Sequence, residues 1–155
     1  NTATNQQYGS GNVNTTTQVG NHQSATVTQG VQATGLGAQN EATVAQQGSW
    51  NFANVQQTGD GNEAILRQEG MDNGRDLGSE ILQSGDDNTA SLIEIGDDNN
   101  AAIDQTGDLN SASLSQTQDN NTAAIEQAGD ENTATLDQDG DANTAAITQS
   151  VDSNR

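Results

Sequence analysis

The sequence predicts an all-β, amyloid-like fold: a parallel β-solenoid of two sheets, built from 22-residue coils with two 11-residue strand-turn units each. Three observations predict it. One phrase returns every 11 residues along nearly the whole chain, its fixed positions advance in steps of two, and one aliphatic column alternates between Leu and Ile. A fixed period of this kind is the signature of repeat architectures.

The repeated phrase is Gln-x-Gly-x-x-Asn-x-Ala-x-(Ile/Leu/Val)-x-Gln. Its Gln column consists of Gln7, Gln18, Gln29, Gln46, Gln57, Gln68, Gln83, Glu94, Gln105, Gln116, Gln127, Gln138 and Gln149. Neighbouring members are 11 residues apart, except where insertions of six and four residues lengthen the spacing near residues 30–38 and 74–78. Because the phase is kept on both sides of each insertion, we expect loops there.

Each unit is expected to form one strand and one turn. In residues 132–138, the side chains of Asn132, Ala134, Leu136 and Gln138 stand at steps of two, which is the period of a strand and not of a helix. The Gly-x-x segment between units supplies the reversal, because Gly tolerates positive φ and Asn or Asp readily adopts turn conformations.

The aliphatic column shows that one coil contains two units. From residue 66 onward the column alternates strictly: Leu66, Ile81, Leu92, Ile103, Leu114, Ile125, Leu136, Ile147. We therefore expect Ile to stack on Ile in one sheet and Leu on Leu in the facing sheet, in parallel and in register.

Composition excludes a conventional globular core, because only 29% of the residues are hydrophobic and 2% aromatic, with a net charge of −19. Stacked Asn and Gln side chains can instead bond to their own copies along the solenoid. An unfolded acidic linker would not keep its phase through two insertions. We expect a single domain over residues 1–155 with about 13 strands.

The phrase resembles the repeats of curlins, the subunits of bacterial curli fibres, as in "QTGDGNEAILRQ" at 57–68 and "QAGDENTATLDQ" at 127–138. The resemblance implies a secreted, extracellular, cell-surface functional amyloid that self-assembles into a homopolymeric fibre for biofilm matrix and adhesion. It also implies a nucleating curlin and curli export machinery as partners. The chain begins at Asn1 rather than Met, which is compatible with removal of a signal peptide.

The resemblance places the internal ladders of the family on particular residues. These are Gln57, Gln68, Gln105, Gln127, Gln138 and Gln149, with Asn62, Asn88, Asn99, Asn110, Asn132 and Asn143. Two departures stand out: Glu94 replaces a Gln, and Gln118 replaces a turn Gly. Between a buried acid with a raised pKa and a frayed rung at Glu94, we favour the frayed rung.

Other functions have weaker support. Asp-rich turns such as residues 96–100 suggest a monomeric calcium-binding solenoid, and outward Thr residues suggest an ice-binding one, but the period and the scattered Thr residues fit neither well. No enzyme, cofactor or metal site is expected, since His22 is the single His and is interpreted as a solvated turn residue. The charge of −19 opposes nucleic acid, and no apolar run approaches the ~20 residues of a transmembrane helix.

The ends of the solenoid are expected to be open. Neither end has a distinct polar cap in the sequence, although monomeric solenoids usually need one. Both ends would then offer unpaired strand edges to another copy, which predicts head-to-tail stacking.

Overall fold

The computed structural model describes residues 1–30, 39–75 and 78–152. Thirteen strands lie in this part of the chain. They are β1 (Thr2–Gln7), β2 (Val13–Asn21), β3 (Ser24–Gln29), β4 (Glu41–Ser49), β5 (Phe52–Thr58), β6 (Glu63–Met71), β7 (Ser79–Ser84), β8 (Thr89–Ile95), β9 (Asn100–Thr106), β10 (Ser111–Thr117), β11 (Thr122–Ala128), β12 (Thr133–Asp139) and β13 (Thr144–Gln149).

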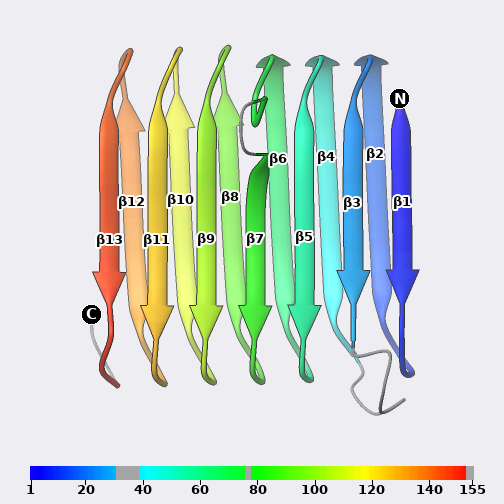
Figure 1. The fold of residues 1–155 in the computed structure, drawn as a ribbon, viewed down its shortest axis with the longest axis vertical. Helices are drawn as coiled ribbons and strands as arrows, with labels where there is room; N and C mark the ends of the chain where they lie inside the picture. The colour runs from blue at the N-terminus through cyan, green and yellow to red at the C-terminus, as the bar shows by residue number, and fades with distance from the viewer. Residues whose placement is uncertain (31–38, 76–77, 153–155) are drawn as a thin grey trace.

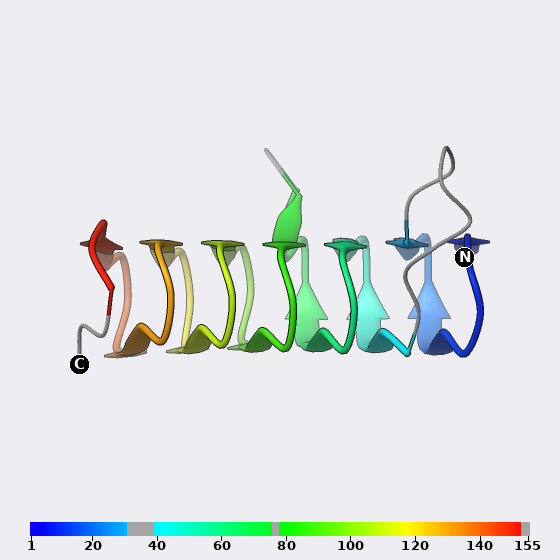
Figure 2. The same cartoon turned by 90° about the horizontal axis from the view of Figure 1, so that it is seen from below.

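The strands form two parallel sheets that face each other (Figures 1 and 2). The odd-numbered strands form a seven-stranded sheet and the even-numbered strands a six-stranded one, each in sequence order. Each strand pairs with the strand one coil further on, so that Leu114 lies beside Leu136 and Ile125 beside Ile147. The predicted two-sheet solenoid with a 22-residue coil is confirmed.

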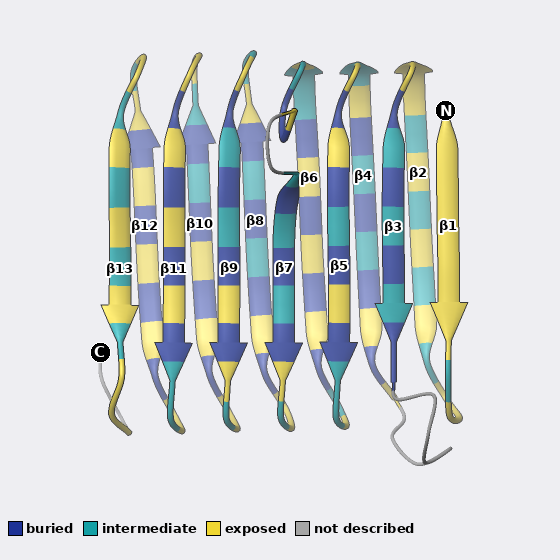
Figure 3. Cartoon of the chain, in the orientation of Figure 1, coloured by how far each residue is buried: buried dark blue, intermediate teal, exposed yellow. Residues whose placement is uncertain are grey.

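The core lies between the sheets and is thin. Figure 3 shows buried and exposed residues alternating along the strands in the middle of the solenoid. Most strands contribute one Ala and one aliphatic side chain to the core; in β10, for instance, Ala112 is 3% exposed and Leu114 1%. Full burial of a Leu or Ile contributes about 1.5–3 kcal/mol, so apolar packing alone is modest here. Backbone pairing and polar contacts between coils must supply the rest.

Every turn reverses the chain with positive φ. Gly48 has φ 114°, and a Cβ on this residue would lie 1.9 Å from the carbonyl oxygen of Gly70 in the next coil. Only Gly permits such an approach. A second left-handed residue follows in each described turn. It is Asp or Asn in four of them, as at Asp98 with φ 58°, and a residue of another type elsewhere.

The two expected insertions fall between strands. All of residues 30–38 except Gly30 lie outside the described residues. In the second insertion, Gly74, Arg75 and Gly78 follow β6 and precede β7, while residues 76–77 lie outside the described part. The strands on either side keep their register, since Ile81 of β7 still pairs with Val55 of β5.

Candidate functional site: the internal ladders and the two ends

The Gln side chains of the odd-numbered strands form an unbroken ladder along the whole solenoid. Each Nε2 donates to the Oε1 of the next Gln at 2.8–3.0 Å, in the order Gln7, Gln29, Gln57, Gln83, Gln105, Gln127, Gln149. The same Nε2 also donates across the interior to a backbone carbonyl of the other sheet, as from Gln105 to Thr89 at 3.0 Å. The ladder therefore joins successive coils and joins the two sheets.

The ladder of the even-numbered strands contains an acid. Gln18 donates to Gln46, Gln46 to Gln68, and Gln68 to Glu94, each at 2.8 Å. The carboxylate of Glu94 has no N–H to pass on. The side-chain amide of Gln116 is satisfied when its nitrogen faces the neighbouring acceptors and its oxygen accepts from the backbone N–H of Ala123 at 3.0 Å, so the common direction of donation in this ladder ends at Glu94.

Glu94 corrects a prediction made from the sequence. Its rung is not frayed: the side chain is 0% exposed and lies within β8. Besides accepting from Gln68, the carboxylate accepts from the hydroxyl of Ser79 at 2.7 Å to each oxygen. Burial raises the pKa of Glu94 to about 7, and the hydrogen bonds from Ser79 and Gln68 reduce that rise.

The compensating residue could have been found in the sequence. Ser79 stands in the Ala column, where its neighbours in the same sheet are Ala53 and Ala101. It lies on β7 and reaches across the interior to Glu94. Two departures from the repeat, close in sequence and opposite in space, therefore explain each other: the hydroxyl supplies the donor that the buried carboxylate needs.

The Asn column ties the turns of neighbouring coils together. The backbone N–H of each Asn donates to the Oδ1 of the Asn one coil earlier, as from Asn110 to Asn88 at 2.9 Å and from Asn132 to Asn110 at 3.0 Å. The side-chain amide donates forward to a turn carbonyl, as from Asn110 to Gly129 at 2.8 Å.

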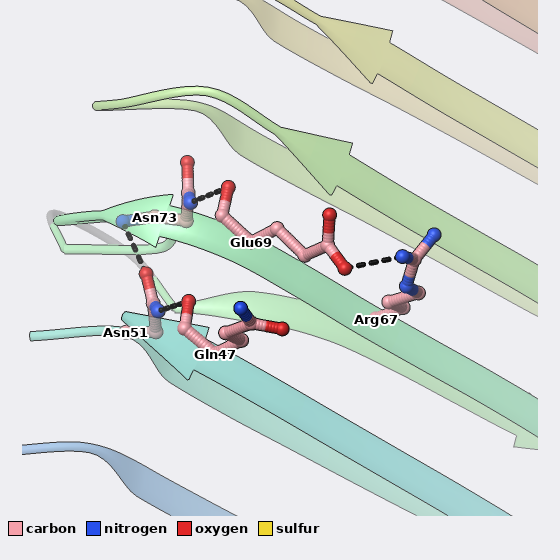
Figure 4. A network of polar contacts seen from close by, with 5 residues as sticks. All are labelled: Gln47, Asn51, Arg67, Glu69 and Asn73. Carbon is pink, nitrogen blue, oxygen red and sulfur yellow. Dashed lines mark hydrogen bonds and ion pairs between the residues drawn. The ribbon is translucent and has the colours of Figure 1, made fainter. Parts of the chain in front are cut away.

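Figure 4 shows the corresponding contacts at the turns after β4 and β6. Asn73 donates its backbone N–H to Asn51, and each of these Asn side chains also donates to the carbonyl four residues before it. An ion pair between Arg67 and Glu69 lies beside them on the outer face. Both backbone and side-chain groups of the Asn column are thus used to hold the turns.

The other ladder residues expected from the sequence occupy the same interior columns. Asn62, Asn88, Asn99, Asn110 and Asn132 are 0–1% exposed, and Asn143 is partly buried. Leu92 and Leu114 pair in one sheet, and Ile103 pairs with Ile125 in the other.

The turn Asp residues accept hydrogen bonds from the preceding coil. The N–H of Asp86 donates to Asp108 at 2.8 Å, Asp108 donates to Asp130 at 2.9 Å, and Asp130 donates to Asp152 at 3.0 Å. Each carboxylate therefore stands beside a like charge and is partly compensated by one N–H. Within the described ranges, no group of three or more His, Cys, Asp or Glu side chains is placed to hold a metal ion.

The two ends differ from each other. At the N-terminal end Asn5, Asn14 and Thr16 take interior positions that are Ala or aliphatic in later coils, and β1 is exposed along its length. At the C-terminal end Ala145 and Ile147 are partly buried against the core. The interior of the N-terminal coil is therefore polar, whereas that of the C-terminal coil is apolar, and β1 and β13 are both edge strands of their sheet.

A family model confirms what the repeat and its ladders indicate. The model of the curlin associated repeat matches residues 37–70, 96–129 and 129–155, more than half of the chain. The chain belongs to the curlin repeat family. No curated protein and no solved structure matches it. Curlin repeat proteins are structural amyloid subunits of extracellular curli fibres and not enzymes.

Two further observations bear on expectations from the sequence. No helix lies in the described ranges, so none there is long and apolar enough to cross a membrane. His22 is exposed in a turn, as expected, but its ring also stacks on Trp50, with centroids 4.1 Å apart and an interplanar angle of 3°.

Proposed function

We propose that this curlin repeat protein is the structural subunit of an extracellular fibre that grows by head-to-tail stacking of solenoids, for biofilm matrix and adhesion. By family resemblance, a nucleating curlin and curli export machinery act with it. The observation that carries the proposal is the common direction of the Gln ladder in the odd-numbered strands, which runs from Gln7 at one end of the described chain to Gln149 at the other.

The ladders give the two ends complementary hydrogen-bonding groups. At the C-terminal end, Gln138 and Gln149 each use one N–H of the side-chain amide for a backbone carbonyl, at 3.3 and 3.0 Å. Their second N–H points in the direction in which earlier Gln residues donate to the next coil. At the N-terminal end, the oxygens of Gln7 and Gln18 are at the start of the ladders, where an added copy would supply donors.

Stacking of opposite ends therefore continues both ladders, whereas stacking of like ends would set donors against donors or acceptors against acceptors. The polar N-terminal interior does not prevent this contact. Within the chain, Val27 already lies over Asn5 and Val44 over Thr16, so an aliphatic side chain meets a polar one in the same columns.

The odd number of strands determines how copies are related. If β1 of an added copy pairs with β12, and its β2 with β13, the solenoid continues without a gap. Each subunit then advances about 31 Å, which is six and a half rungs at about 4.8 Å, and turns by roughly 180° apart from any twist.

A fibre reconstruction by cryo-electron microscopy tests this geometry. We expect a rung repeat of about 4.8 Å and a subunit junction at which the Ile column changes sides. A junction with the Ile column continuous on one side would contradict the half-turn, and discrete monomers with covered ends would contradict the fibre.

A capping variant tests the direction of growth. Ile147→Lys places a charge in the interior column of the last strand, so this chain can add its intact N-terminal end to a growing fibre but cannot accept the next copy. We expect substoichiometric amounts to slow elongation of the natural protein. Thr148→Lys, on the outer face of the same strand, is the matched control and should not slow it.

A further inference from the structure

The turn after β4 contains an aromatic cluster that neither the core nor the ladders use. Trp50 is 48% exposed and Phe52 37%. Both line a hollow of about 370 Å³ together with Asp72 and Arg75. A second hollow of about 440 Å³ shares Asp72 and Arg75 and continues along the same turn edge past Asp98 to Asn120. The two form one groove across several coils.

The half-exposed Trp50 indole lines this groove. His22, one coil earlier, covers one face of the indole in a parallel stack at 4.1 Å. The N–H of Asp72 donates to the carbonyl of Ser49 at 3.1 Å, so Asp72 belongs to the coil that follows Trp50. The stack on His22 thus holds one face of the ring, and the exposed part of the ring borders the hollow.

A Trp residue does not suit the backbone conformation of the turn at position 50. Trp50 has φ 60°, a left-handed conformation that is an outlier for a bulky side chain, and the same position is Asp72 and Asp98 in the following coils.

The insertion after β6 builds the opposite wall. A Cβ on Gly74 would lie 2.4 Å from the carbonyl oxygen of Phe52. The N–H of Gly74 donates to the carbonyl of Asn99 at 2.7 Å. Arg75 donates its N–H to the carbonyl of Asp72 at 3.2 Å, and its guanidinium lies 3.5 Å from the Asp72 carboxylate. The polar groups are therefore held in place beside the aromatic ones.

We propose that this groove binds a neutral oligosaccharide segment. An exposed indole in a hollow suits the apolar surface of a sugar ring, and the carboxylate, guanidinium and amide groups beside it suit pairs of hydroxyls. The net charge of −19 opposes an anionic polymer, and in the aromatic hollow Arg75 is paired with Asp72, so the formal charges there cancel and favour a neutral ligand. The groove lies on the turn edge and away from both ends, so the proposal holds whether or not the solenoids stack.

Trp50 makes the binding directly measurable because it is the single Trp of the chain. The full-length folded protein is titrated with cellohexaose, mannohexaose and N-acetylchitohexaose while Trp emission is followed. We expect a saturable change with at least one probe. Equilibrium dialysis with that probe in labelled form then compares variants whose far-UV circular dichroism is unchanged.

Trp50→Ala is expected to weaken binding about tenfold or more, and Trp50→Phe to keep affinity within about threefold, since an aromatic face remains. Arg75→Gln should weaken binding as well. Leu109→Ala is the matched control, because Leu109 is also an exposed turn residue with φ 59°, and it should leave binding unchanged.

Two results would overturn the proposal. One is that none of the three probes produces a saturable change in Trp emission up to about 10 mM, a concentration above the Kd of weak specific complexes. The other is equal binding by the natural protein and Trp50→Ala. Oligogalacturonate, an anionic probe, should bind at least tenfold more weakly than the best neutral probe, and equal binding would also contradict the neutral ligand class.

Discussion

Replacement of Glu94 by Gln should raise the free energy of unfolding of the solenoid at neutral and alkaline pH. At acidic pH the replacement should have almost no effect. The pKa of Glu94 is about 7 in the folded chain, against an ordinary value of 4.5. Because the folded value is higher, the folded state retains a proton that the unfolded chain releases. The contribution of this group to stability is therefore complete below pH 4.5 and is lost as the pH rises to about 7.

The magnitude follows from the displacement of the pKa. A change from 4.5 to about 7 corresponds to about 3 kcal/mol in the free energy of unfolding. Glu94→Gln has no carboxyl to titrate and can still accept hydrogen bonds from Gln68 and Ser79. At pH 8 the variant should thus be more stable by up to about 3 kcal/mol, and at pH 4 nearly equal.

Urea unfolding followed by far-UV circular dichroism, at fixed protein concentration from pH 4 to pH 8, measures this difference. With a slope of about 2 kcal/mol/M, the midpoint should shift by about 1.5 M at pH 8. Asp137→Asn removes one charge from the outer face of the even-numbered sheet and is the matched control. A Glu94→Gln difference that is the same at pH 4 and pH 8, or that Asp137→Asn reproduces, would refute the reasoning.

Three further predictions concern the turns. Gln118 occupies a Gly position with φ 73°, so Gln118→Gly should raise stability by about 1 kcal/mol, seen as a midpoint temperature about 2–4 °C higher; an unchanged or lower value would contradict the strain. Gly48→Ala should cost about 3 kcal/mol or more in urea unfolding, because its Cβ would collide with the Gly70 carbonyl, whereas Gly78→Ala, with the same sign of φ but open space, should cost only about 1 kcal/mol. Stacked Asp carboxylates about 4.8 Å apart repel by roughly 1 kcal/mol per neighbour in water, so added salt, divalent cations or acid should shorten the lag of assembly in a thioflavin assay, and equal lags at low and high salt would count against it.

The sequence by itself determined the architecture. In-register parallel stacking places each residue beside its copy one coil away, so a repeat of identical residues already contains the register. The alternation of Leu92 with Ile103 separated the two sheets, and the preserved phase around residues 74–78 identified an insertion. The same logic predicted the Gln and Asn columns, because every member of a column has the same surroundings.

Only the tertiary structure decided what happens where a column departs from its pattern. Whether Glu94 is frayed or buried depends on the side chain across the interior, and the hydroxyl of Ser79 belongs to the other sheet. The common direction of the side-chain amides, which distinguishes the two ends, likewise depends on hydrogen-bond geometry and not on residue identity. The groove between Trp50 and Arg75 exists because an insertion after β6 lies beside a turn one coil earlier, and a repeat pattern contains no information about residues that interrupt it.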